Sequence, residues 1–168
     1  SSVTLGEKPG SEKGELQMQQ AKDQIDFAAK NEIPFVRVLL TLNPQPIQAD
    51  LETAKARYQE LCHYARDKKV RVLIETCGLL SDSVKMAQFI AGADEETRGV
   101  LWDIQHPYRH CKETPKQTVA NLGKEIRYVH VKDSVVTENG ETEYRMMGLG
   151  DLPVFDAVRE LYRMGYDG

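Results

Sequence analysis

The hydrophobic positions along the chain change period several times, and each change marks a strand followed by a helix. Short runs of branched apolar residues, typical of strands buried on both faces, alternate with stretches in which apolar residues recur every three or four positions. Such repeated units predict an α/β fold with a parallel sheet covered by helices, either a closed barrel or an open doubly wound sheet. The predicted strands are the end of one at residues 1–5, then Phe35–Leu40, Val70–Glu75, Gly99–Asp103 and Ile126–His130.

Five amphipathic helices are predicted between and after these strands. The first begins near Glu15, and Thr114 with Pro115 supplies an N-cap and a first-turn proline for the fourth. The last spans Asp151–Met164. The residues expected to face the core are, in chain order, Met18, Ala21, Ile25 and Ala28; Leu51, Ala54, Tyr58, Leu61 and Ala65; Val84, Ala87 and Ile90; Val119 and Leu122; and Val154, Val158, Leu161 and Tyr162.

A hairpin is predicted ahead of the last helix. The pair Asn139-Gly140 lies between two short segments of strand-forming residues, 135–137 and 142–144. A two-residue Asn-Gly loop suits the twist of paired strands, so the two segments are expected to pair around it.

The composition narrows the class of protein. The chain has 168 residues, of which 40% are hydrophobic and 29% are charged, as expected for one globular domain of mixed structure. Its formal net charge of -4 gives no basic surface for DNA or RNA, so no nucleic-acid partner is expected. With no apolar run of about 18 residues and no signal-peptide pattern, we expect no membrane association and a cytoplasmic location. Cys62, Cys77 and Cys111 form no CxxC pair and are interpreted as reduced thiols.

Three consecutive predicted strands end in a residue that can bind a metal. These residues are Glu75, Asp103 and His130, about one strand–helix unit apart. In a barrel, the carboxyl ends of the strands meet at one rim, so the three side chains are expected to converge there. Two carboxylates and an imidazole suit a divalent cation such as Mn²⁺, Co²⁺, Mg²⁺ or Zn²⁺. The alternative is that each polar residue only begins a solvated loop.

Segments at these strand ends resemble a known family. Val72–Glu75, Leu101–His106, Tyr128–Asp133, Gly148–Asp151 and Gly165–Gly168 are similar, in order and spacing, to successive signatures of the xylose-isomerase-like TIM-barrel superfamily. That superfamily includes ketose 3-epimerases, hydroxypyruvate isomerase, inosose dehydratases and isomerases, dehydroshikimate dehydratases and apurinic endonucleases. The resemblance covers nearly the whole chain and implies a (β/α)8 barrel as one domain over residues 1–168.

The resemblance also assigns roles. It implies that Glu75, Asp103 and His130 bind one divalent metal ion and that His106 contacts substrate oxygens, although His106 is alternatively a loop imidazole facing solvent. Lys132 shares the face of His130 by strand alternation, so it either reaches the substrate or forms a salt bridge near the site. Arg145 either clamps a substrate phosphate or carboxylate or is a surface arginine.

The chain also departs from the resembled family. That family's barrel has eight strands and a fourth metal ligand, a glutamate directly after the Gly-Tyr-Asp-Gly stretch, which here is 165–168. Counted against that pattern, the sequence supplies strands three to seven, about five strand–helix units. We therefore expect an incomplete barrel whose remaining units belong to a longer protein. Its exposed sheet edges should favour association, and homo-oligomer formation is left open.

The implied activity is proton transfer next to a carbonyl on a small polyhydroxylated substrate. We expect a metal-dependent isomerase or epimerase of a keto-sugar or related polyol that reacts through an enediolate. Glu75 is the candidate catalytic base, because a ligand glutamate keeps a second oxygen for the substrate. The alternatives are a dehydratase or lyase of the inosose or dehydroshikimate type and a non-catalytic barrel segment of a larger protein. An apurinic endonuclease is disfavoured, because its three-metal site needs more histidines than His63, His106, His110 and His130.

Overall fold

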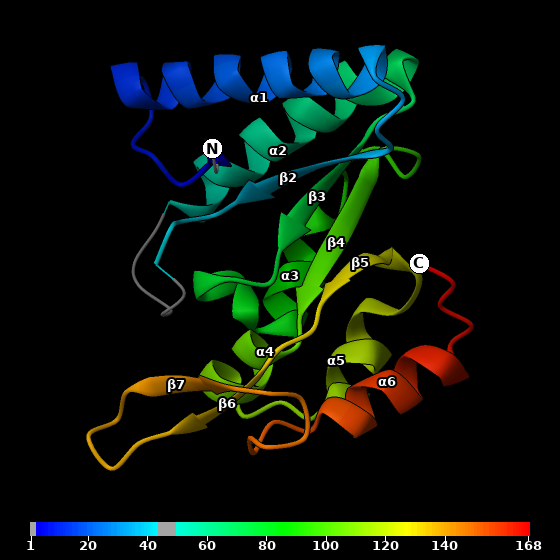
Figure 1. The fold of residues 1–168 in the computed structure, drawn as a ribbon. Coiled ribbons are helices and arrows are strands. Elements are labelled where there is room, and N and C mark those ends of the chain that lie inside the picture. The colour runs from blue at the N-terminus through cyan, green and yellow to red at the C-terminus, as the bar shows by residue number, and fades with distance from the viewer. Residues whose placement is uncertain (1–2, 44–49) are drawn as a thin grey trace.

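The centre of the molecule is a parallel sheet of five strands in sequence order (Figure 1). The computed structural model describes residues 3–43 and 50–168. All four pairs of neighbouring strands are parallel, which confirms the predicted α/β fold. The predicted strand at 1–5 appears at Val3–Thr4, with residues 1–2 outside the described part. The strands are β1 (Val3–Thr4), β2 (Phe35–Leu39), β3 (Arg71–Glu75), β4 (Arg98–Asp103) and β5 (Ile126–His130).

Helices connect these strands, and their boundaries follow local capping chemistry. The first helix starts three residues before the predicted Glu15, because the Ser11 side chain accepts a hydrogen bond from the Gly14 amide and caps it. Thr114 forms the predicted cap, as part of a capping box with Gln117. The helices are α1 (Glu12–Lys30), α2 (Leu51–Ala65), α3 (Ser83–Ile90), α4 (Gln105–Cys111), α5 (Pro115–Leu122) and α6 (Val154–Arg163), with short 3₁₀ turns η1 (Arg66–Lys68), η2 (Gly78–Ser81) and η3 (Gly123–Glu125).

The hydrophobic core lies between one face of the sheet and the helices. The predicted inward residues of α1 are all buried, as are Ala54, Tyr58, Leu61 and Ala65 of α2. The Tyr58 hydroxyl sits between the backbones of β3 and β4, donating to carbonyl oxygens and accepting from the Gly99 amide at 3.1 Å. The sheet residues in this core are Val3, Val36, Val38, Val72, Ile74, Val100, Trp102 and Ile126.

Two predicted helix faces are wrong in part. In α3, Val84 is half exposed, whereas Met86 and Phe89 are buried with the predicted Ile90. This short helix has apolar residues around most of its circumference, so spacing alone does not select the inward side. In α6, Val158 and Tyr162 are exposed, and Ala157 is buried instead. The buried stripe of α6 is Val154, Ala157 and Leu161.

The opposite face of the sheet carries the polar side chains. Residues paired across a parallel sheet point to the same side, and the register pairs Arg37 with Leu73, Glu75 with Leu101 and Asp103 with His130. The last of these pairs depends on a bulge in β5, in which residue 127 is extra. Val100 pairs with Ile126, and the next residue of β4, Leu101, pairs with Tyr128. Ile126 therefore faces the core, whereas His130 faces the same side as Asp103.

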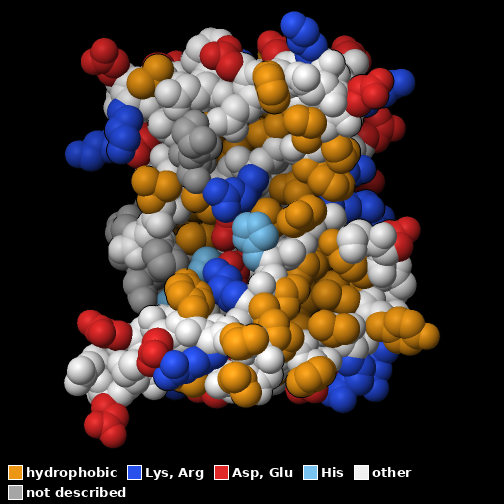
Figure 2. All heavy atoms as spheres, in the orientation of Figure 1, with side chains coloured by type: hydrophobic (Ala, Val, Ile, Leu, Met, Phe, Trp, Pro, Cys, Tyr) orange, Lys and Arg blue, Asp and Glu red, His pale blue; other side chains and the backbone are white. Residues whose placement is uncertain are grey.

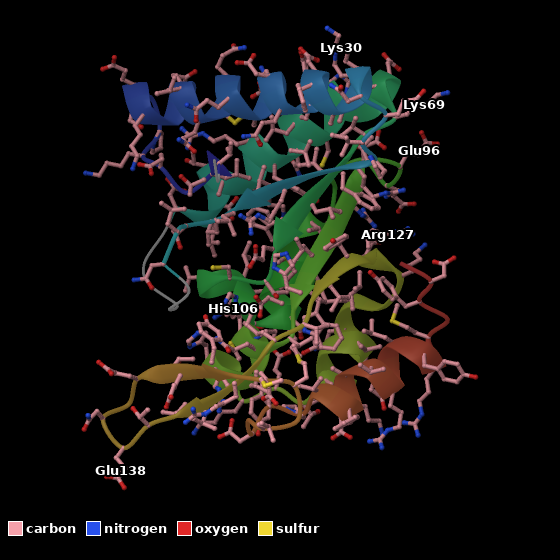
Figure 3. All side chains as sticks on the ribbon, in the orientation of Figure 1. Lys30, Lys69, Glu96, His106, Arg127 and Glu138 are labelled. Carbon is pink, nitrogen blue, oxygen red and sulfur yellow. The ribbon has the colours of Figure 1, made fainter. Side chains whose placement is uncertain are left out.

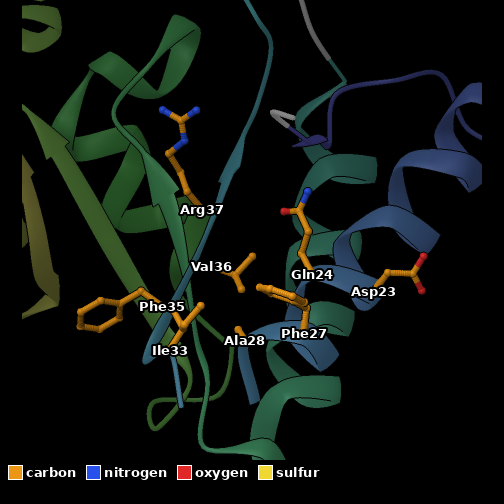
Figure 4. A pocket seen from close by; sticks show the side chains of 8 residues that line it. All are labelled: Asp23, Gln24, Phe27, Ala28, Ile33, Phe35, Val36 and Arg37. Atoms are coloured by element: carbon orange, nitrogen blue, oxygen red, sulfur yellow. The ribbon is translucent and has the colours of Figure 1, made fainter. Parts of the chain in front are cut away.

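Both edges of the sheet carry apolar side chains. Within the described residues, β1 pairs only with Val38 and Leu39, so the first half of β2 has no strand partner on that side. A cavity of about 400 Å³ lies there, between α1 and β2, with Phe27 pointing toward Val36 (Figure 4). At the other edge, a cavity of about 480 Å³ lies between β5 and α6, lined by residues that include Tyr128.

The predicted hairpin is confirmed, but its loop is longer than predicted. Strands β6 (Asp133–Val136) and β7 (Thr142–Arg145) pair antiparallel and extend away from the main sheet (Figure 1). The Thr137 amide donates to the Glu141 carbonyl, which leaves three residues in the loop instead of two. Gly140 takes a left-handed conformation with φ of 80°, as three-residue hairpin loops require at this position.

The structure describes all three cysteines and the helices of the ranges given above. Cys62, Cys77 and Cys111 are free thiols. Burial raises the pKa of Cys62 to about 12 and that of Cys77 to about 11, so both stay protonated at neutral pH. In the ranges that the structure describes, no helix has the length and apolar character needed to cross a membrane.

Candidate metal centre and substrate site

The ends of β3, β4 and β5 bring Glu75, Asp103 and His130 together. Glu75 and Asp103 are buried, and Nδ1 of His130 lies 3.8 Å from Oε1 of Glu75 and 3.9 Å from Oδ2 of Asp103. Atoms that each bind one ion at about 2.0–2.6 Å lie about 3–4 Å apart, so these three groups are spaced to share a divalent cation.

The Asp103 carboxylate shows most directly that a cation fits here. Its Oδ1 accepts a hydrogen bond from the Gln105 amide at 3.0 Å. Its Oδ2 is buried without a hydrogen-bond partner in the described structure, although the Lys132 ammonium lies 2.5 Å away as an ion pair. A buried carboxylate oxygen is costly unless a cation compensates it. The Lys132 ammonium provides that charge here, and a metal ion on Oδ2 would provide it in the same way.

His106 is a fourth group directed at the same point. It lies in α4, directly after β4 (Figure 3), and is buried, so the alternative of a solvent-facing loop histidine is wrong. Nδ1 of His106 lies 2.8 Å from the Thr76 carbonyl oxygen, which can only accept, so Nδ1 carries the proton. In the neutral imidazole, Nε2 then presents a lone pair, 3.9 Å from Oδ2 of Asp103. One ligand atom each of Glu75, Asp103 and His106 lie within 4.8 Å of one another.

Thr76 fixes the ends of β3 and β4 relative to each other. Its hydroxyl accepts a hydrogen bond from the Asp103 amide at 2.9 Å and donates to the Asp103 carbonyl at 3.3 Å. Its carbonyl holds the His106 ring, as described above. A single buried residue thus orients a predicted metal ligand and a predicted substrate-binding residue.

Two cations flank the carboxylates. Lys132 contacts Asp103, as its predicted face requires, and Nη1 of Arg37 donates to Oε2 of Glu75 at 2.9 Å. The second oxygen of Glu75, expected to be available to the substrate, is therefore bonded to Arg37. Sequence reasoning does not single out Arg37; the available signal was a charged residue inside the apolar run Phe35–Leu40.

Asp133 anchors the glycine-containing loop beside the site. Its buried carboxylate accepts hydrogen bonds from the backbone amides of Ser134, Gly148, Gly150 and Leu152. Burial on its own raises the pKa of Asp133, but the four amide donors together lower it below its usual value. A Cβ at position 150 would lie 2.0 Å from Oδ1 of Asp133, which explains the glycine there.

Gln105 and Arg109 connect this loop to Asp103, and sequence reasoning misses both. The backbone N–H of Gln105 donates to Asp103, and the side-chain Oε1 of Gln105 accepts a hydrogen bond from the Ser134 hydroxyl at 2.9 Å. The Arg109 guanidinium donates to the Ser134 carbonyl at 2.8 Å and forms an ion pair with Asp151. The polar contacts therefore continue from the carboxylate cluster to the loop at 146–152.

Arg145 lies apart from the cluster. It belongs to β7, where its guanidinium forms an ion pair with Glu143 at 2.7 Å, and both side chains are exposed. Among the contacts that the structure describes, none joins Arg145 to Glu75, Asp103 or His130. Its predicted role in substrate binding stays a prediction.

The open face of the molecule displays this arrangement directly. Figure 2 shows red carboxylate atoms and pale blue imidazoles in the middle of the face, with blue Lys and Arg side chains above and below them. Apolar side chains in orange border the group on the side of the sheet edge. This face therefore presents acidic and imidazole groups between cationic side chains.

Comparisons with known proteins identify the family and the fold. The sequence matches the family described as xylose isomerase-like TIM barrel over residues 1–168, so the chain belongs to that family. No curated protein sequence matches it.

Three solved structures illustrate the structural likeness. A D-tagatose 3-epimerase-like protein has a TM-score of 0.79 and 19% identity, covering 98% of this chain and 64% of its own. A Mycobacterium smegmatis xylose isomerase-like TIM barrel protein in complex with magnesium has a TM-score of 0.77 and 18% identity, covering 99% and 63%. A Methylomonas sp. D-allulose 3-epimerase in complex with D-allulose has a TM-score of 0.77 and 15% identity, covering 99% and 58%. The chain thus spans about three fifths of the length of these proteins.

Proposed function

We propose that this chain carries the metal site of an isomerase or epimerase that acts on a small keto-sugar or related polyol by proton transfer through an enediolate. The observation that carries the proposal is the convergence of Glu75, Asp103 and His130 around the buried Oδ2 of Asp103. Membership of the xylose isomerase-like family and the likeness to sugar epimerases support it.

Glu75, Asp103 and His130 are the proposed ligands of one divalent ion, which is Mn²⁺, Co²⁺, Mg²⁺ or Zn²⁺. When bound, such an ion would supply the electrophile that stabilises negative charge developing on substrate oxygens. Burial of both carboxylates keeps water away from them and strengthens their interaction with a cation. The complex of one similar protein with magnesium supports the choice of a hard divalent ion.

Glu75 and His106 are the proposed groups that act on the substrate. Nε2 of His106 presents a lone pair, so it would accept a hydrogen bond from a substrate hydroxyl and orient it. Glu75 would remove the proton next to the carbonyl through the oxygen now bonded to Arg37. Base action by Glu75 therefore requires Arg37 to release that oxygen. Lys132 and Arg145 complete the proposed substrate-binding residues.

The experiment that tests the proposal compares metal content and proton exchange in the natural full-length protein. Asp103→Asn should bind Mn²⁺ with at least about 100-fold lower affinity, a loss of about 2.7 kcal/mol in binding free energy, because it removes a ligand charge from a buried site. It should also abolish incorporation of solvent deuterium next to the carbonyl of a ketose, followed by NMR. Asp94→Asn is the matched control, because Asp94 pairs with Arg66 on the surface. Unchanged metal content in Asp103→Asn would reject the site. Release of water instead of isomerisation would identify a dehydratase.

Three further properties belong to the proposal as predictions from the sequence. They are a cytoplasmic location, the absence of a nucleic-acid partner and an oligomeric state that is left open between monomer and homo-oligomer. Cell fractionation, nucleic-acid binding at physiological salt and light scattering of the full-length protein would test them in turn.

A further inference from the structure

The charges around the site do not balance once a metal ion is counted. Without an ion, the two buried carboxylates of Glu75 and Asp103 are each paired with one cation, Arg37 and Lys132. A divalent ion on the same carboxylates, with imidazoles neutral as metal ligation requires, leaves these groups with two positive charges in excess, and with one when the glutamate expected as the fourth ligand is counted. A site with this excess attracts a negatively charged ligand, most strongly where burial lowers the effective dielectric constant.

The two cations are also placed where a ligand could meet them. Arg37 comes from β2 and Lys132 follows β5, so they lie on either side of the carboxylates that end β3 and β4. Their side chains are 39% and 26% exposed, whereas the carboxylates are buried behind them. Figure 2 shows the same order on the open face, with cationic side chains on two sides of the carboxylates and imidazoles. A ligand entering from this face meets the cations first.

We propose that the substrate carries an anionic group, a carboxylate or a phosphate, and that Arg37 and Lys132 bind it. This inference rests on the proposed function and narrows its substrate class to acidic or phosphorylated keto-polyols. The planar guanidinium of Arg37 offers several donors in a fork that matches either anion, and the Lys132 ammonium adds a point charge.

Anion binding would also have a consequence for Glu75. The Arg37 guanidinium donates to Oε2 of Glu75 in this structure, and a substrate anion competes for the same donors. When Arg37 turns to the anion, Oε2 becomes available to take the proton next to the carbonyl. Binding of the correct substrate is thereby coupled to release of the base, and a neutral sugar of the same length leaves Glu75 engaged.

The test uses two pairs of probes that differ only in charge. Dihydroxyacetone phosphate is compared with dihydroxyacetone, and glycerate with glycerol, by calorimetry on the full-length protein loaded with Mn²⁺. The wild-type protein should bind at least one anionic probe about tenfold or more tightly than its neutral partner, as expected for charge-assisted hydrogen bonds. Whichever pair shows the larger ratio identifies phosphate or carboxylate as the anion.

Variants assign the preference to the two cations. Arg37→Met and Lys132→Met should each lower affinity for the anionic probe by a larger factor than affinity for its neutral partner, so that most of the anion preference is lost. Arg37→Lys, which keeps the charge, should retain part of the preference even if loss of the Glu75 partner destabilises Arg37→Met. Arg66→Met is the matched control, because Arg66 is a similarly exposed arginine that pairs with Asp94 outside the site. Thermal unfolding of each variant confirms that it is folded.

Equal affinity of the wild-type protein for charged and neutral probes would overturn the inference. The inference would also fail if Arg37→Met and Arg37→Lys lost affinity for the anionic probe and for its neutral partner by the same factor. Arg37 would then be only a structural partner of Glu75. Metal content and deuterium exchange in the same preparations separate this failure from that of the proposed function: a protein that binds metal and exchanges protons without anion preference loses only the inference.

Discussion

The two faces of the sheet use the same strands for opposite purposes. On the helix side, alternate residues such as Val72, Ile74, Val100 and Trp102 are buried in one apolar cluster. On the other side lie Glu75 and Asp103, which directly follow Ile74 and Trp102. Both carboxylates pair with cations instead of packing against apolar side chains. Glu75 and Asp103 are as buried as these apolar residues, so burial alone does not separate residues that stabilise the fold from residues that form the site.

The difference lies in what compensates the burial. Apolar side chains gain free energy when they leave water, whereas a carboxylate loses its hydration and needs a partner of opposite charge. A cluster of paired charges on one face of a sheet contributes little net stability, and its retention is expected where a ligand uses it. Changes on the helix side should therefore alter stability, and changes on the open side should alter binding and activity.

The largest effect is expected on the helix side. Trp102→Ala should lower the free energy of unfolding by about 3–5 kcal/mol, because it leaves a large cavity between β4 and the helices. Denaturant unfolding followed by circular dichroism measures this loss. Tyr128→Ala on the open face, where the side chain is 47% exposed, should cost clearly less. Equal losses for the two variants would mean that the faces do not differ in this way.

His106→Ala should show the opposite combination of effects. We expect kcat/KM of the full-length enzyme to fall by about 10²-fold or more, equivalent to about 2.7 kcal/mol of lost transition-state interaction. Stability should fall by only about 1 kcal/mol, because the variant leaves the Thr76 carbonyl without its ring partner. Elemental analysis is the control: intact metal content agrees with a substrate contact, and loss of metal would make His106 a ligand.

Asp133→Asn should give a smaller effect that depends on pH. At neutral pH the variant should be less stable by about 1–3 kcal/mol, because an amide cannot accept all four backbone donors. The folded-state pKa of Asp133 lies below the unfolded value of about 3.9, so the wild-type contribution is complete above that pH and is lost as the pH falls through the folded pKa. Urea unfolding at several pH values should show the difference between the two proteins narrowing below about pH 4. A difference independent of pH would contradict the anchor role of the Asp133 charge.

Much of the fold follows from the sequence because strand runs and strand ends carry strong local signals. The boundaries of β5 and the approach of Glu75, Asp103 and His130 to one another agree with prediction, since parallel strands one unit apart end side by side. The ligand and catalytic roles of these residues stay predictions.

The errors and omissions have physical causes that lie outside local patterns. The face of α3 depends on what packs against it, which apolar spacing on a short helix does not specify. The loop at Asn139-Gly140 is set by the pairing of Thr137 with Glu141, one residue further out than the dipeptide suggests. Arg37 is recognised only through its contact with Glu75, a residue on the neighbouring strand.

The single extra residue in β5 makes the site depend on parity. Were β5 paired without a bulge from Ile126 onward, Val129 would lie opposite Asp103 and His130 would turn toward the helices. The bulge at position 127, with no change to Ile126 or His130, therefore decides whether the imidazole reaches the carboxylates. Removal of one residue there would restore regular pairing and still leave the imidazole opposite Asp103, so the contact is set by the pairing of β5 with β4 and not by the length of the strand alone.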